Sequence, residues 1–131
     1  MSIKAQLRRW QQRGQIDAVI CENVLRLEAR LAEHWQIDIS TAQVEVLLLH
    51  VASSLGRIGR GGCVSPLYRP MFEEMRNAEL FPMALAIHQD LLQCLPAIPE
   101  AEQSYFLANI YTLVQEQQSR LHCPINEESV V

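Results

Sequence analysis

Apolar residues recur at intervals of three and four along most of the chain, and runs that alternate between apolar and polar residues are nearly absent. This spacing puts apolar side chains on one face of an α-helix, whereas a half-buried strand would repeat every two residues. We therefore expect an all-α fold, a compact bundle of about five helices. Helices are predicted over 15–36, 40–59, 66–77, 81–95 and 99–118, with a shorter helix over 3–12 before them.

Residues that favour helix ends stand at the predicted boundaries. Ser40 is the predicted N-cap of the second long helix, and Pro66 suits the first turn of the third. Pro99 opens the fifth helix, where Glu100 and Glu102 are favourably placed near the positive end of the helix dipole.

The length of 131 residues is enough for one domain. We expect a basic, helical N-terminal segment over 1–14, a helical domain over 15–120 and a flexible C-terminal tail over 121–131. The net charge of -4 argues against a general nucleic-acid binder, so nucleic acid is not an expected partner. The N-terminal segment is locally basic, which fits either a solvated helix face or a local nucleic-acid contact. Its basic residues are Lys4, Arg8, Arg9 and Arg13.

Cysteine usage and hydropathy predict a cytoplasmic protein that does not enter a membrane. Cys21, Cys63, Cys94 and Cys123 lie far apart and form no CxxC pair, which favours reduced thiols over a disulfide framework. No apolar run approaches the roughly 20 residues that span a bilayer, and the first residues lack the apolar core of a signal peptide.

No pattern typical of an enzyme is present. The chain lacks a serine–histidine–aspartate order, a phosphate-binding glycine loop and a dinucleotide-binding motif. His34, His88 and His122 show no metal-ligand spacing, and the tryptophans and tyrosines are predicted to be packing residues. We therefore expect neither catalysis nor a metal or other cofactor.

One histidine stands in the apolar second long helix. His50, Ser53, Ser54 and Arg57 are spaced i, i+3, i+4 and i+7, which places them on one helix face, and seven residues span about 10.5 Å. A neutral imidazole nitrogen can attack phosphorus, and serine hydroxyls and a guanidinium can then stabilise the phosphoryl oxygens. The same pattern also fits a hydrogen-bonded core histidine, so spacing alone leaves both interpretations open.

Three stretches together resemble the PTS regulation domain (PRD), a helical module of bacterial antiterminators and activators that respond to the sugar phosphotransferase system. LLLHVASSLGR, residues 47–57, resembles the family's first histidine motif. LFPMALAI, residues 80–87, resembles the Tyr/Phe-Pro segment that opens the fourth helix, and IPEAEQSYFLANIYTLV, residues 98–114, resembles the second motif. The resemblance covers residues 15–117 and implies a PRD-like fold.

The resemblance assigns roles to particular residues. It implies that His50 is the phosphoacceptor and that Arg57 is the motif arginine. The helical spacing adds Ser53 and Ser54 as further groups that would support the phosphate. Asn109 stands where the family's second histidine is expected, and because an amide cannot accept a phosphoryl group, the chain has one acceptor at most. The sequence also departs from the family at Leu49, and it matches the opening of the last helix at Pro99, Glu100 and Glu102.

Asn109 also has a structural interpretation. It shares a helix face with Tyr105, Phe106 and Leu113, so a buried amide there would need a hydrogen-bond partner. We favour a bond across to the helix of His50, and the alternative is a contact with the main chain.

The resemblance implies a phosphorylation-responsive regulator of transcription or antitermination. A phosphorylated protein of the phosphotransferase system, HPr or an enzyme II domain, would donate to His50 and bias a homodimer between two arrangements. Fewer than 15 residues precede the first long helix, so we expect action in trans on a regulator subunit. The alternatives are a degenerate dimeric interaction module that is not phosphorylated and a carrier of the histidine phosphotransfer type.

Overall fold

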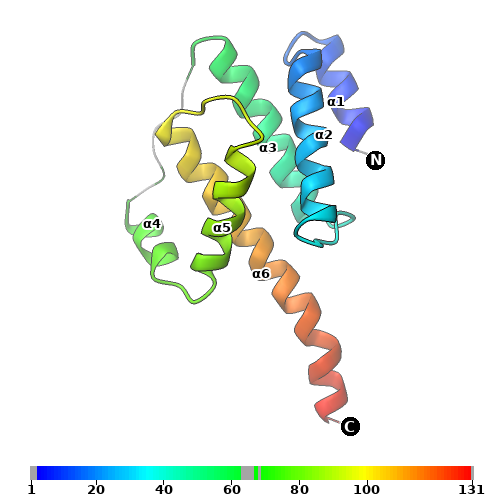
Figure 1. Cartoon of the computed structure of the whole chain (residues 1–131), viewed down its shortest axis with the longest axis vertical. Coiled ribbons are helices and arrows are strands. Elements are labelled where there is room, and N and C mark those ends of the chain that lie inside the picture. The colour runs from blue at the N-terminus through cyan, green and yellow to red at the C-terminus, as the bar shows by residue number, and fades with distance from the viewer. Residues whose placement is uncertain (1–2, 63–66, 68, 131) are drawn as a thin grey trace.

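The computed structural model describes residues 3–62, 67 and 69–130, with side chains described as far as residue 118. In these residues the chain forms six helices and no strand, which confirms the predicted all-α class (Figure 1). The six are the five helices expected for the bundle and the shorter N-terminal helix predicted over 3–12. None of these helices combines the length and hydropathy required to cross a bilayer. The helices are α1 (Ile3–Gln12), α2 (Ala18–Glu33), α3 (Ala42–Gly59), α4 (Arg69–Arg76), α5 (Phe81–Leu92) and α6 (Glu100–Val130).

The last helix is central to the bundle. α6 packs against α3, α5 and α4, while α1 lies on the outer side of α2 and α3 (Figure 1). Leu7 of α1 is fully buried, so the basic N-terminal segment is packed onto the domain by an apolar face. Its cationic side chains, Lys4, Arg8, Arg9 and Arg13, are exposed.

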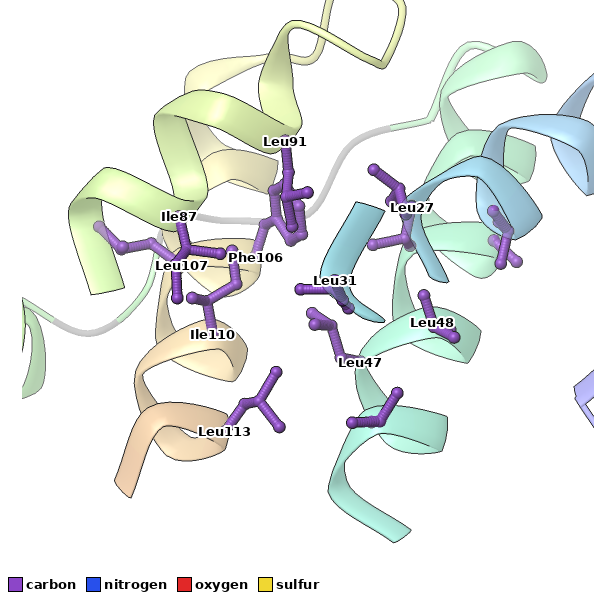
Figure 2. Packing of buried hydrophobic residues seen from close by; sticks show 14 of the residues in the cluster. Leu27, Leu31, Leu47, Leu48, Ile87, Leu91, Phe106, Leu107, Ile110 and Leu113 are labelled. Atoms are coloured by element: carbon purple, nitrogen blue, oxygen red, sulfur yellow. The ribbon is translucent and has the colours of Figure 1, made fainter. Parts of the chain in front are cut away.

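A single apolar core joins the helices. Leucines from α2 and α3 meet side chains of α5 and α6 in the space between these four helices (Figure 2). Burying a side chain of this size stabilises the fold by about 1.5–3 kcal/mol. The labelled members of the core are Leu27, Leu31, Leu47, Leu48, Ile87, Leu91, Phe106, Leu107, Ile110 and Leu113.

The structure corrects the predicted N-cap of α3. Thr41, and not Ser40, caps this helix: its hydroxyl accepts a hydrogen bond from the Val44 amide at 3.3 Å. Ser40 is turned away because its own amide and hydroxyl donate to the Asp38 carboxylate, at 3.0 and 2.6 Å. The competing turn at Asp38 therefore moves the helix start by one residue.

Two other boundaries need comment. α6 continues to Val130 and projects beyond the bundle, whereas the sequence predicted that the helical pattern would end by residue 120 (Figure 1). Extending a formed helix needs no new nucleation step, so α6 continues past the end of the apolar pattern even though Pro124 supplies no main-chain donor. Pro66, the predicted first turn of the third helix, lies outside the described residues.

A network of hydrogen bonds between partly exposed side chains joins α5 to the end of α2. The Arg30 guanidinium donates two hydrogen bonds to the Asp90 carboxylate, at 2.8 and 2.7 Å, and Trp35 Nε1 donates a third at 2.9 Å. The hydrogen bonds from Arg30, helped by that from Trp35, lower the pKa of Asp90 to about 2. This network fixes the two helices that face the core from opposite sides.

Gly56 allows α3 to approach the turn between α1 and α2. A β-carbon at Gly56 would lie 2.5 Å from the main-chain oxygen of Gln15, well inside van der Waals contact. The Arg60 guanidinium donates to that same oxygen at 2.9 Å, so the turn cannot retreat without losing this bond.

We predict that Gly56→Ala lowers the free energy of unfolding by about 1–2 kcal/mol, because overpacking outweighs the better helix propensity of alanine. Gly59→Ala is the matched control, since a β-carbon at Gly59 of the same helix meets nothing within 4 Å. Urea unfolding of both variants makes the comparison, and the control is expected to be neutral or stabilising. Equal effects of the two substitutions would contradict the close approach at Gly56.

Candidate functional site

The candidate site lies where the second half of α3 runs beside the first turns of α6. The buried face of α3 carries Leu47, Val51 and Leu55, which anchor the helix in the core. His50 sits beside this face and is half-buried. The ring is therefore neither sealed in the core nor free in solvent.

The imidazole of His50 has an unsatisfied nitrogen. Its Nε2 is buried and has no hydrogen-bond partner, and the nearest aromatic ring is that of Tyr105, with centroids 6.5 Å apart. Burial lowers the pKa of His50, the charge of Glu102 acts in the opposite direction, and the charge of Arg57 lowers it further. The ring is therefore largely neutral near pH 7, the state in which one nitrogen can act as a nucleophile.

Arg57 is held by a carboxylate from α6. Its Nε donates to Glu102 Oε2 at 3.0 Å and its Nη2 to Glu102 Oε1 at 2.8 Å, which is a bidentate pair. The Glu102 side chain is 0% exposed, whereas the Arg57 side chain is 30% exposed. Arg57 thus compensates a buried negative charge while part of its side chain remains exposed.

The two serines of the predicted site differ. Ser54 is buried, and its hydroxyl accepts a third hydrogen bond from Arg57 at 3.3 Å. Ser53, one residue earlier, is exposed. The structure therefore brings His50, Ser54 and Arg57 together on α3, joined to Glu102 of α6, and leaves Ser53 at the rim.

Asn109 does not make the bond that we favoured from the sequence. The side chain is half-buried, and its Nδ2 donates to the Tyr105 carbonyl of its own helix at 2.9 Å. A side-chain amide can reach the main-chain carbonyl four residues earlier within one helical turn. Asn109 therefore bonds to its own helix and not to α3.

Glu102 has a role in the site that the sequence analysis did not predict. Its position in the first turn of α6 suggested an interaction with the helix dipole alone. However, Glu102 precedes Phe106, Ile110 and Leu113 at helical spacing, and all three are buried. A carboxylate on the apolar face of a helix is the signal that predicts a buried ion pair.

The other histidines and cysteines lie elsewhere. His88 is 5% exposed between α5 and α6, packed edge-on to Phe106, and neither of its ring nitrogens has a hydrogen-bond partner. His34 is exposed beside Trp35, and Cys21 and Cys94 are half-buried free thiols. Within the described part of the chain, no group of three histidine, cysteine or acidic side chains is placed to hold a metal ion. Cys63 lies outside the described residues, as do the side chains of His122 and Cys123.

These features define a small all-α protein with a half-buried histidine beside a buried Arg–Glu pair. The chain belongs to the same family as an uncharacterized protein of Haemophilus influenzae, to which it is 58% identical over 118 residues, 89% of this chain and 94% of that protein. It is also 29% identical over 102 residues to the uncharacterized protein YhfY of Escherichia coli, covering 76% of this chain and 84% of YhfY. No family model and no solved structure matches the chain.

Proposed function

We propose that the protein is a PRD-like regulatory module of the sugar phosphotransferase system that accepts a phosphoryl group on His50. The observation that carries this proposal is the buried, unpaired Nε2 of a half-buried imidazole next to Arg57. A buried polar atom without a partner is rare and calls for an explanation such as a functional role, because it retains the full desolvation penalty of about 1–3 kcal/mol. The motifs around residues 50, 81 and 99 add the resemblance to the PRD family.

The chemistry is transfer from a phosphohistidine of a donor protein, HPr or an enzyme II domain. The lone pair of an unprotonated nitrogen of His50 forms the new P–N bond. The donor P–N bond breaks, and its electron pair returns to the donor imidazole. The lowered pKa of His50 keeps that lone pair available, and Arg57 offers charge-assisted hydrogen bonds to the phosphoryl oxygens.

The regulatory output follows from the charge that arrives. A phosphoryl group adds about -1.5 to -2 at the surface between α3 and α6. In this proposal the change biases a homodimer between two arrangements, and a regulator subunit in the bacterial cytoplasm reads that bias in trans. The protein itself catalyses no reaction.

A second candidate is an interaction module that has lost phosphorylation. Two observations favour it: Asn109 replaces the family's second histidine, and Arg57 is already engaged by Glu102. In that case the fold and a dimer surface would remain while His50 stays unmodified.

The deciding experiment is a labelling assay. Purified protein is incubated with phosphoenolpyruvate, enzyme I, HPr and enzyme II domains, and acid-labile phosphate is measured by intact mass. We expect a single phosphoryl group per chain, lost in His50→Ala and retained in His34→Ala and His88→Leu. These controls are matched because His34 is exposed and His88 is buried without a neighbouring cation.

Each result selects one function. Labelling that depends on His50 supports the proposal, and labelling by a two-component kinase alone supports the phosphotransfer carrier. Absence of labelling with every donor leaves the degenerate module. The dimer is then compared before and after phosphorylation by sedimentation, and identical behaviour would remove the proposed output.

A further inference from the structure

Building on the proposed function, we infer that Arg57 exchanges partners when His50 is phosphorylated: it leaves the buried Glu102 carboxylate and binds the phosphoryl group. Glu102 is then a positioning residue, which holds the guanidinium in the unmodified state and competes for it in the modified state. The inference rests on the juxtaposition of His50, Arg57 and Glu102 at the contact of α3 with α6.

The unmodified state explains why Arg57 points at α6. A fully buried carboxylate is stable only with a hydrogen-bonded counter-charge, and Arg57 supplies two bonds at 2.8 and 3.0 Å. The bond to Ser54 orients the guanidinium along α3, toward the turn that carries His50. The Arg57 side chain is 30% exposed and follows His50 by seven residues on the same helix face, so its flexible stem can turn the guanidinium toward a group attached to the imidazole.

When His50 carries a phosphoryl group, Arg57 prefers that group to the Glu102 carboxylate. A phosphoryl group carries up to twice the charge of a carboxylate and has three acceptor oxygens, so it binds a guanidinium more strongly. It also repels the Glu102 carboxylate, because the two anions would share one cation. Arg57 Nη2 already donates to Glu102 and to Ser54, so a phosphoryl group that takes a bidentate bond from the guanidinium competes with these acceptors for Nη2.

The exchange transmits the modification into the fold. If Arg57 leaves, the fully buried Glu102 carboxylate loses two charge-assisted hydrogen bonds, so we expect the first turn of α6 to move or the carboxylate to take up a proton. The next turn of α6 holds Ser104, whose hydroxyl accepts a hydrogen bond from the Leu67 amide at 3.0 Å, just before α4. Phosphorylation at α3 therefore acts on α6 and, through Ser104, on the residue that leads into α4 (Figure 1).

The test uses phosphoramidate, a small-molecule donor whose ammonia leaves as the imidazole nitrogen bonds to phosphorus. The full-length chain is labelled with ¹⁵N, and the Arg57 Nε–H resonance is followed by NMR before and after phosphorylation. We expect this resonance to shift and to lose the protection from exchange that the bond to Glu102 provides. This measurement on the unsubstituted protein does not depend on whether a variant folds.

A thermodynamic cycle adds a second readout. Phosphorylation is expected to lower the urea midpoint of the wild-type chain by about 1 M at pH 8, and to leave that of Glu102→Gln unchanged. Glu100→Gln is the matched control: Glu100 is exposed in the same helical turn, so this variant should respond to phosphorylation as the wild type does.

The outcomes distinguish a failure of the partner exchange from a failure of the proposed function. If His50 is phosphorylated while the Arg57 resonance stays in place, or Glu102→Gln responds like the wild type, the partner exchange is wrong and the proposed function stands. If neither phosphoramidate nor a phosphoprotein modifies His50, the proposed function and the exchange both fail.

Discussion

Arg57→Met is expected to lower the free energy of unfolding by about 3–5 kcal/mol. The reason is that Glu102, whose side chain is 0% exposed, would remain buried without its cation. Methionine keeps much of the aliphatic stem, so the loss reports the missing charge and hydrogen bonds more than lost packing. Urea unfolding at pH 7, with the slope of the transition compared between variants, is the measurement.

Two variants make this result specific to the buried pair. Arg60→Met removes a charge at the C-cap of α3, where the side chain is exposed and donates to the Gln15 main-chain oxygen, and it should cost only about 1 kcal/mol. The double variant Arg57→Met/Glu102→Leu removes both charges and should recover most of the lost stability. If the double variant is as unstable as Arg57→Met, the loss comes from packing, and the electrostatic account of this contact is wrong.

The fold was largely predictable because the core is assembled from helical faces. The three- and four-residue spacing of apolar residues indicated α2, α3, α5 and α6, and Leu27, Leu47 and Ile110 on those faces are fully buried. Pro82 in the first turn of α5 likewise matches its predicted position. Such features depend on residues close in sequence, so a single chain is enough to recognise them.

The details that failed depend on competition between partners. Ser40 does not cap α3 because its hydroxyl donates to the Asp38 carboxylate instead. Asn109 could bond to α3 or to its own main chain, and its amide donates to the Tyr105 carbonyl of its own helix. The pairing of Arg57 with Glu102 joins residues 45 positions apart, and the sequence contains no record of that contact beyond the apolar face of α6. Sequence reasoning therefore put His50 and Arg57 on one helix face without the carboxylate that binds Arg57.

His50 and His88 are both lowered-pKa histidines, yet they pose different physical problems. His50 is half-buried at the contact of α3 with α6, next to the charges of Arg57 and Glu102. His88 lies between α5 and α6 with Phe106 against its ring. The unpaired nitrogens of His88 are therefore a stability cost that no accessible chemistry offsets, and they give a prediction of their own.

His88→Leu is expected to raise the free energy of unfolding by about 2 kcal/mol at pH 7, because it replaces two unpaired buried nitrogens with apolar atoms of similar volume. The gain should grow as the pH falls. Burial lowers the pKa of His88, and a main-chain interaction with Gln103, too irregular to satisfy either ring nitrogen, acts in the opposite direction. Below pH 6.5 the unfolded chain therefore takes up a proton that the folded chain does not bind. Wild-type stability therefore drops from pH 6.5 downward.

The control for His88→Leu is His34→Leu, at an exposed histidine, which should change stability by less than about 0.5 kcal/mol at either pH. Urea midpoints at pH 7 and pH 5.5 give the full comparison. Since His50 also has a lowered pKa, His88→Leu should reduce the pH dependence without abolishing it, and His50→Ala/His88→Leu should reduce it further. A destabilised His88→Leu would mean that the imidazole contributes an interaction with α6 stronger than its desolvation cost.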